Sequence, residues 1–265
     1  MADDRRDPGH LLDLLWRTHA PGSRGPRGSL SLDRVVATAV EIADAEGVAA
    51  VSMRRVAERL GVTTMSLYRY VPGKDDLVDL MFEMATGLPD DAAWPEDWRG
   101  GLAAFARASR ALLLARPWML DVPISAPPMG PNNLAWMEAA LSRLARTGLD
   151  EGEMVGVLSI LSGYTFFEAG QQLAMSRAAP RTGVGYSEWG QAYAAMLERV
   201  AGDGRYPTLA RVARAGGFGD ERSGPEEDFE YGLSFILDGV EALIGARAHR
   251  AARGGAGVPE GPGVN

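Results

Sequence analysis

Apolar residues between positions 31 and 61 recur at the three- and four-residue spacing of amphipathic helices. The first predicted helix begins after Ser31, a residue type that caps helix N-termini, and it stops at Gly47. The second begins after Ser52 and ends at Gly61, because a glycine readily takes the left-handed conformation that closes a helix. Each of these two helices therefore carries its own start and stop signal.

A third, shorter helix is predicted from Thr63 to the residue before Pro72, since the position preceding a proline resists the helical conformation. Leu67 is its expected buried anchor. A fourth helix follows the "PGK" sequence, and its inward stripe has helical spacing. The residues of that stripe are Leu77, Leu80, Met81 and Met84.

The helical period continues through most of the remaining chain, and no alternating pattern predicts a strand. We therefore predict an all-α fold with an N-terminal three-helix helix-turn-helix domain, a linking helix and a larger C-terminal helical domain. The further predicted helices cover 97–115, 132–147, 150–177, 187–201 and 226–249. The predicted domains are a flexible arm at 1–28, the helix-turn-helix domain at 29–76, the larger helical domain at 77–249 and a disordered tail at 250–265.

Composition narrows the chemistry. The 265 residues include no cysteine, and the three histidines, His10, His19 and His249, lie near the ends of the chain. Disulfides and thiolate metal sites are excluded, and we expect no metal and no cofactor. No apolar run is long enough to cross a bilayer, and "LLDLLW" is too short for a signal peptide, so a cytoplasmic protein is expected.

Charge is unevenly distributed along the chain. The whole chain carries −8, but residues 24–74 hold eight basic and five acidic side chains, a local charge of +3. Lys74 is the only lysine, and all the other basic residues are arginines. A net negative charge argues against indiscriminate binding to nucleic acid. A modestly basic module joined to an acidic body is compatible with binding to a limited DNA site.

The two helices on either side of Gly61 have the spacing of a helix-turn-helix, whose second helix enters the DNA major groove. With Leu67 inward, the same short helix presents Thr63, Thr64, Met65, Ser66, Tyr68, Arg69 and Tyr70 to the outside. Thr64 and Met65 suit base edges, and the tyrosine hydroxyls suit phosphate oxygens. Lys74 would lie at the start of the fourth helix, beside another phosphate. The alternative is that the tyrosines pack in the core and Lys74 is only solvated.

The N-terminal arm has two interpretations. Its prolines and glycines are typical of a disordered linker. Alternatively, Arg24 and Arg27 reach a DNA minor groove, as basic arms beside helix-turn-helix units do.

The segment "IADAEGVAAVSMRRVAERLGVTTMSLYRYVPGKDDLVDLM" resembles the N-terminal DNA-binding domain of the tetracycline-repressor (TetR) family of bacterial transcriptional regulators. The elements "LGV", "SLYxYV" and "KxxL" occur in order at that family's spacing. The resemblance implies that Arg54 reaches toward the groove and that Thr64 and Met65 read bases. It implies phosphate contacts from Ser52, Ser66, Tyr68, Tyr70 and Lys74. It also implies a homodimer, more often a repressor than an activator, that binds operator DNA and a small effector.

Aromatic and methionine side chains in the C-terminal part suit an adaptable apolar ligand site, although core packing is the competing interpretation for each of them. Glu168 lies between apolar neighbours, so its carboxylate would need a partner. The candidate effector residues are Trp118, Trp136, Met137, Tyr164, Phe167, Glu168, Gln171, Gln172, Met175, Trp189, Tyr193 and Met196.

The predicted helices at 150–177 and 226–249 are apolar on more than one face, as expected of helices that also pack against a second protomer. Two such helices per subunit would form a four-helix dimer interface. Two other functions are compatible with a helical body: a small-molecule sensor acting through protein contacts, and an enzyme using Glu168 with a second carboxylate. No recognisable catalytic spacing supports the enzyme.

Overall fold

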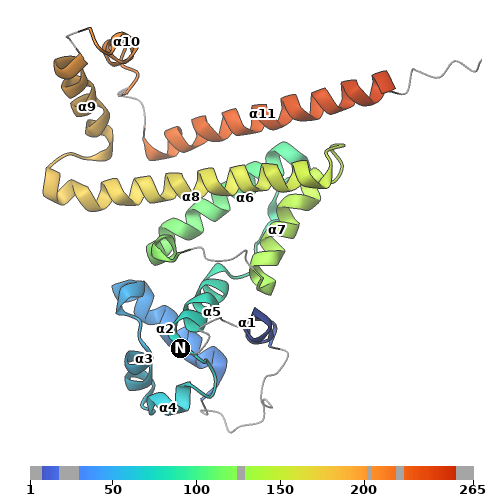
Figure 1. Ribbon diagram of the computed structural model, residues 1–265, viewed down its shortest axis with the longest axis vertical. Coiled ribbons are helices and arrows are strands. Elements are labelled where there is room, and N and C mark those ends of the chain that lie inside the picture. Colours follow the sequence, from blue (N-terminus) through green and yellow to red (C-terminus); the bar gives the residue numbers. More distant parts are fainter. Residues whose placement is uncertain (1–7, 18–29, 124–128, 202–203, 219–223, 255–265) are drawn as a thin grey trace, which may run out of the picture. The chain divides into compact units, whose positions relative to one another are not determined.

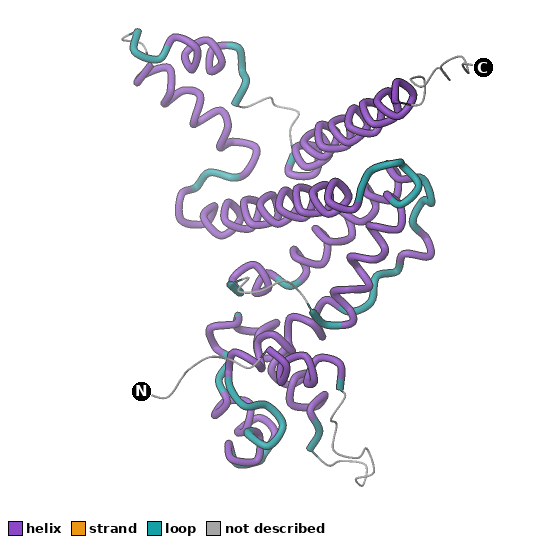
Figure 2. The backbone as a smooth tube through the Cα atoms, turned by 45° about the vertical axis from the view of Figure 1, so that its right-hand side comes forward, coloured by secondary structure: helices purple, strands orange, loops and turns teal. Residues whose placement is uncertain are grey.

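The computed structural model describes residues 8–17, 30–123, 129–201, 204–218 and 224–254. The chain forms two compact units, one up to Arg143 and one from Leu144 onward, and each is described by itself. Every regular element in the described ranges is a helix, which confirms the predicted all-α fold (Figure 2).

The first unit contains the two predicted helices with their expected caps. Helix α2 (Leu32–Glu46) begins at Ser31, whose hydroxyl accepts a hydrogen bond from the Arg34 amide at 3.2 Å. A 3-10 turn, η1 (Val48–Ala50), leads to α3 (Met53–Leu60), where Ser52 accepts in the same way from Arg55. Gly61 ends α3 in the left-handed conformation, at φ 71°. The capping residues predicted from the sequence therefore mark where both helices begin and end.

Residues 63–70, called the reading segment below, and the linking helix follow. Helix α4 (Thr64–Leu67) is a single turn, and α5 (Lys74–Thr86) begins after Gly73. Helix α2 packs against both α3 and α5 (Figure 1). This core consists of side chains that are almost fully buried, namely Val35, Val36, Ile42, Val56, Leu67, Leu77, Leu80 and Met81. The predicted third helix is regular only as far as Leu67, because residues 68–70 continue as turns.

The N-terminal region differs from its prediction. Residues within the expected flexible arm form α1 (Pro8–Trp16), which packs against α5 (Figure 1). Leu15 is buried in this contact region, and the Trp16 indole donates a hydrogen bond to the Met129 carbonyl at 2.9 Å. Arg24 and Arg27, the proposed minor-groove residues, lie outside the described residues.

Four further elements complete the first unit. They are η2 (Asp91–Ala93), α6 (Trp98–Ala115), η3 (Pro117–Asp121) and α7 (Pro131–Leu144). An aromatic cluster joins α6 to α7: the Trp136 ring lies 5.6 Å from Trp94 and 6.0 Å from Phe105. Arg143 donates from Nη2 to the Asp91 carbonyl at 3.0 Å, which holds η2 on α7.

The second unit contains α8 (Glu151–Thr182), α9 (Tyr186–Ala201), α10 (Pro207–Arg214) and α11 (Pro225–Gly254). Helix α8 begins with a capping box, in which Asp150 and Glu153 each accept a hydrogen bond from the other's backbone amide. It runs past Pro180 to Thr182, five residues beyond its predicted end. Helix α11 likewise continues to Gly254, into the segment predicted as a disordered tail.

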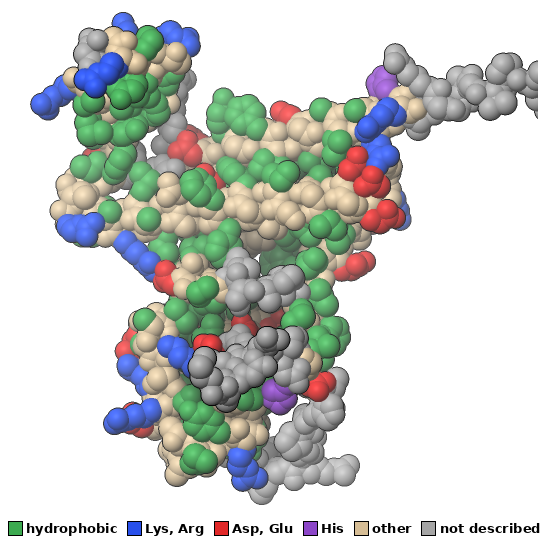
Figure 3. All heavy atoms as spheres, viewed as in Figure 1, with side chains coloured by type: hydrophobic (Ala, Val, Ile, Leu, Met, Phe, Trp, Pro, Cys, Tyr) green, Lys and Arg blue, Asp and Glu red, His purple; other side chains and the backbone are tan. Residues whose placement is uncertain are grey.

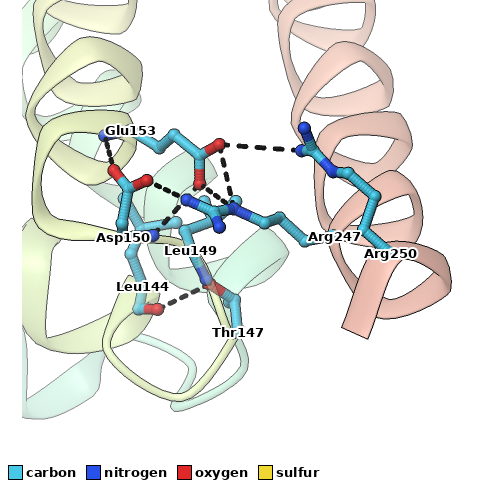
Figure 4. A network of polar contacts seen from close by, with 7 residues as sticks. All are labelled: Leu144, Thr147, Leu149, Asp150, Glu153, Arg247 and Arg250. Atoms are coloured by element: carbon cyan, nitrogen blue, oxygen red, sulfur yellow. Dashed lines mark hydrogen bonds and ion pairs between the residues drawn. The ribbon is translucent and has the colours of Figure 1, made fainter. Parts of the chain in front are cut away.

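Helices α8 and α11 lie side by side (Figures 1 and 2). Near one end of the pair, Arg247 of α11 forms ion pairs with Asp150 and Glu153 at the start of α8 (Figure 4). Farther along, the Tyr164 and Phe229 rings stack with centroids 5.6 Å apart, and the Tyr164 hydroxyl donates to the Phe229 carbonyl at 2.8 Å. A charged contact and an aromatic contact thus fix the register of the two helices.

Candidate nucleic-acid interface

The segment 63–70 presents an anchored, outward-facing surface. Leu67 is fully buried and holds the segment on the core. On the opposite side, Met65 is 72% exposed and Tyr68 is 47% exposed. Met65 on α4 and Tyr68 directly after it are therefore accessible to a partner. This arrangement matches the predicted orientation of a DNA-reading helix.

Hydroxyl side chains lie at the starts of α3 and α4. Ser52 and Thr63 cap these helices by accepting backbone amide hydrogen bonds from Arg55 and Ser66, at 3.2 and 3.3 Å. The hydroxyl oxygens of Thr63 and Ser66 are 2.9 Å apart, so one donates to the other. A hydroxyl that accepts from an amide still has its own proton to give. Phosphate oxygens are suitable acceptors for such protons.

Tyr70 is positioned differently from Tyr68. Its side chain is half-buried, and its hydroxyl donates a hydrogen bond to the Leu30 carbonyl at 2.9 Å. The sequence assigned this hydroxyl to a phosphate, but the structure gives its proton to the residue before the α2 cap. Only the oxygen lone pairs of Tyr70 remain, and a phosphate oxygen does not donate to them. Tyr70 therefore joins the end of the reading segment to the start of α2.

Two cations flank the reading segment. Arg54 on α3 is highly exposed, and its Nε donates to Glu58 one turn later at 2.8 Å. This hydrogen bond raises the pKa of Arg54 above its usual value. The guanidinium is charged at neutral pH in any case. Lys74 is exposed at the first position of α5, directly after Gly73, which has no side chain to cap the helix. A phosphate near Lys74 would also face the amides of that first turn.

The candidate effector residues fall in both units of the chain. In the first, Trp118 is buried and its indole donates to the Asp44 carboxylate of α2 at 2.6 Å. The Trp136 indole donates to the Gly87 carbonyl at 3.0 Å, and Met137 is half-buried on the same helix. Both tryptophans thus serve contacts within the first unit. Local sequence patterns do not indicate these partners, because they lie 74 and 49 residues away.

The other candidates belong to the second unit. Tyr164 is engaged with Phe229 of α11, whereas Phe167 is 60% exposed. The Trp189 and Tyr193 rings lie 5.5 Å apart on α9. Half-buried positions on α8 are Glu168, Gln172 and Met175, whereas Gln171 of α8 and Met196 of α9 are exposed. Assembly of these residues into one effector site remains a prediction.

Glu83 was not predicted, yet it is a buried carboxylate of the first unit, only 7% exposed. It lies on α5 and accepts hydrogen bonds from the backbone amides of Asn132 and Asn133, in the first turn of α7. The Asn133 side chain donates to it as well. A carboxylate at a helix N-terminus satisfies amides that have no partner within the helix. The available signal was an acidic residue between Phe82 and Met84 in an otherwise apolar stretch.

The described ranges contain neither a membrane-spanning helix nor a metal-binding cluster. None of the helices there is long and apolar enough to span a bilayer. The same residues contain no group of three or more histidine, aspartate or glutamate side chains placed to hold a metal ion.

A capped helix, a left-handed glycine and a second helix with a buried anchor and an exposed outer face define a helix-turn-helix DNA-binding protein. Comparison with known proteins identifies the family within this class. Residues 35–81 match the family model for bacterial regulatory proteins of the tetR family, and residues 89–244 match the tetracyclin repressor-like C-terminal domain. The chain belongs to the TetR family and is an effector-responsive, DNA-binding transcriptional regulator.

Similar proteins cover nearly the whole chain. The HTH-type transcriptional repressor DrrR1 of Streptomyces coeruleorubidus is 43% identical over 249 residues, which are 93% of this chain and 90% of that protein. An HTH-type transcriptional regulator of Saccharopolyspora erythraea is 29% identical, over 82% of this chain and 86% of its own. Among solved structures, apo ActR of Streptomyces coelicolor is 28% identical with a TM-score of 0.67, covering 84% of this chain and 99% of ActR. ActR has also been solved with (S)-DNPA and with actinorhodin.

Proposed function

We propose that this chain is a homodimeric repressor that binds a two-fold symmetric operator and releases it when a small effector binds the C-terminal domain. The observation that carries the proposal is the reading segment, where exposed Met65 and Tyr68 stand around buried Leu67. Residues 29–76 would bind the DNA, in the bacterial cytoplasm, and residues 77–249 would bind the effector and the second protomer. The repressor names of relatives support the direction of control.

The proposed DNA contacts fall into two groups. Thr64 and Met65 would read base edges, Met65 through apolar contact with a thymine methyl group. Thr63 at the start of the reading helix and Arg54 on α3 would approach the same groove. The phosphate contacts would come from Ser52, Ser66, Tyr68 and Lys74. Tyr70 would act by holding the reading segment on residue 30, consistent with its hydrogen bond to the Leu30 carbonyl.

Dimerisation would use the outer faces of α8 and α11. Ile160 and Phe167 lie seven residues apart on α8 and are about 60% exposed, at 63% and 60%. On α11, Tyr231 and Phe235 are also exposed. Their rings pack edge to face, with ring centroids 4.6 Å apart. Figure 3 shows apolar side chains along both helices. A second copy of the same pair would cover these faces in a four-helix bundle.

The proposed effector is an apolar aromatic molecule. Trp189 and Tyr193 on α9, which are not fully buried, offer aromatic surface, and Glu168 and Gln172 on α8 add polar groups. ActR, which is similar over most of its length, binds actinorhodin and (S)-DNPA. Those two compounds are therefore the first probes for this chain.

The test is selection of a duplex by the purified full-length chain from a random DNA pool, followed by fluorescence anisotropy on the recovered sequence. We expect a two-fold symmetric site with half-site centres about 34 Å apart, bound tightly at physiological salt. Actinorhodin or (S)-DNPA should weaken binding by about 5- to 150-fold if it is accepted as an effector. Failure to enrich any sequence would overturn the repressor and favour a sensor that acts through protein contacts.

A further inference from the structure

Helix α1 lies outside both regions that match the family models, which begin at residues 35 and 89. It is nevertheless built into the first unit. A nine-residue helix is too short to be stable alone in water, so its contacts with the rest of the unit must hold it. Those contacts identify what α1 does.

Three successive residues at the end of α1 engage three different partners. Leu15 is buried where α1 packs on α5. The Trp16 indole donates to the Met129 carbonyl, just before α7. The Arg17 guanidinium pairs with the Asp33 carboxylate in the first turn of α2. The end of α1 therefore contacts α2, α5 and the residues just before α7.

The backbone at Arg17 supports this interpretation. Its φ of 56° is the only positive value for a residue other than glycine in the described ranges. The left-handed conformation disfavours a residue with a Cβ atom. It is maintained here where the chain turns so that Trp16 faces Met129 and Arg17 faces Asp33. A left-handed residue commonly follows the last turn of a helix, and here it ends α1 at the point where both contacts are made.

Met129 also lies close in sequence to the residues that hold the start of α7 on α5. Gly130 and Pro131 follow it, and the amides of Asn132 and Asn133 then bind the Glu83 carboxylate on α5. The contacts form a closed circuit that runs from α2 through α1 to α7, and from α7 through Glu83 to α5, which packs back on α2. In a closed circuit no single element tilts without breaking a contact.

We propose that α1 is an intrachain strap, with Trp16 and Arg17 as positioning residues that fix α2 and α5 for operator binding. This inference rests on the proposed function. Lys74 lies nine residues before Glu83 on α5, about 14 Å along the helix axis. A tilt of about 5° around Glu83 would move Lys74 by about 1 Å, which is about twice the range of N–H···O hydrogen-bond lengths. If the tilt of α5 is fixed before DNA binds, less conformational entropy is lost on binding.

The experiment compares four full-length proteins: the wild type, Trp16→Phe, Arg17→Gly and the double variant. Phenylalanine keeps a ring but removes the indole N–H, and glycine keeps the left-handed backbone but removes the guanidinium. The matched control is Leu12→Ala, an exposed position on the same helix. Operator affinity is measured on the selected duplex, with its salt dependence and base preference. Hydrogen exchange is measured over residues 74–86 and 131–135 without DNA, and the melting temperature is recorded.

The double variant should bind the operator about three- to tenfold more weakly, as expected from losing one to two modest polar contacts. The salt slope and base preference should stay unchanged, because no DNA contact is removed. Exchange should become faster in α5 and the first turn of α7, while the protein remains folded at the assay temperature. Leu12→Ala should behave as wild type.

Two results would overturn the strap. One is wild-type affinity and wild-type exchange in the double variant. The other is a loss of affinity fully explained by a lower folded fraction, with faster exchange confined to α1. If the wild type itself binds no duplex, the repressor proposal fails, and the exchange measurement still decides whether α1 restrains α5 and α7.

Discussion

Arg247 donates hydrogen bonds from Nε to both carboxylate oxygens of Glu153, at 3.1 and 2.8 Å, and so joins the last turns of α11 to the first turn of α8. The same guanidinium also pairs with Asp150, the residue that caps α8. One side chain therefore forms ion pairs with two acidic groups at a helix N-terminus (Figure 4). Arg250, one turn nearer the chain end, is more exposed and reaches Glu153 only at 4.0 Å.

Arg247→Ala should lower the free energy of unfolding by about 1 kcal/mol, because it removes a partly exposed, charge-assisted contact with two partners. Urea denaturation followed by circular dichroism measures this change. Arg250→Ala is the matched control and should change stability by less than about 0.5 kcal/mol. Equal effects from the two substitutions would show that the network does not depend on the geometry at Arg247.

Glu83→Ala should destabilise the first unit by about 2 to 4 kcal/mol, since it leaves the buried amides of Asn132 and Asn133 without their acceptor. Glu83→Gln should cost less, because the amide oxygen still accepts one hydrogen bond. Thermal unfolding measures both. Glu138→Ala, at an exposed position on α7, is the control and should stay within about 0.5 kcal/mol of wild type.

Lys74→Ala should weaken binding to all DNA sequences alike, because a phosphate contact carries no sequence information. It should also reduce the slope of log affinity against log salt by about one unit. Tyr68→Phe should weaken binding similarly but leave the slope intact, since it removes a hydroxyl and no charge. Anisotropy titrations at several salt concentrations test both, and unchanged affinity would remove these residues from the interface.

Substitutions at Thr64 and Met65 should change which sequence is preferred. Met65→Ala removes the apolar contact, and we expect a loss of about 1 to 3 kcal/mol on the preferred site with little change on mismatched sites. Thr64→Val keeps the shape and removes the hydroxyl, so discrimination should relax at one base position. Repeating the selection with each variant is the measurement. A uniform loss across all sequences would count against base reading.

Ile160→Glu or Phe235→Glu should convert the proposed dimer to monomers at micromolar concentration, because each places an unpaired charge in an apolar interface. Analytical ultracentrifugation measures the assembly state. Met65→Glu is the control, since it places the same charge on an exposed methionine of the reading segment. If the Ile160 and Phe235 variants sediment as wild type does, α8 and α11 do not form the interface.

Much of the structure of the helix-turn-helix domain follows from local sequence signals. The caps at Ser31 and Ser52 and the glycine at 61 are side-chain and backbone preferences of single residues, so the sequence alone located α2 and α3. The all-α fold follows for the same reason. Helix α1 was missed because packing on α5 stabilises it, and a short apolar run does not show where it will pack. The end of α8 was placed early because Pro180 lies within the helix instead of after it.

The candidate site was less predictable where roles depend on distant partners. Surface positions such as Met65 follow from the burial of Leu67, a relationship within one helical turn. Trp118 and Glu83, by contrast, bind groups far along the chain, at Asp44 and at the start of α7. A periodic pattern records which face is apolar but does not identify the polar group that meets it. The assignments of DNA and effector contacts remain predictions for the experiments above.

The close approach of Glu83 to Gly130 limits how the two positions can change during evolution. A Cβ atom at residue 130 would lie 2.2 Å from a Glu83 carboxylate oxygen, so alanine there would force the Glu83 side chain to shift away from the amides that it binds. Gly130 is therefore favoured for as long as the acid keeps this position, whereas the constraint on residue 130 disappears once residue 83 becomes small. Homologues should consequently lose the two residues as a pair, with the acid leaving first. An alignment deep enough to order those two changes would recover this contact from sequences alone.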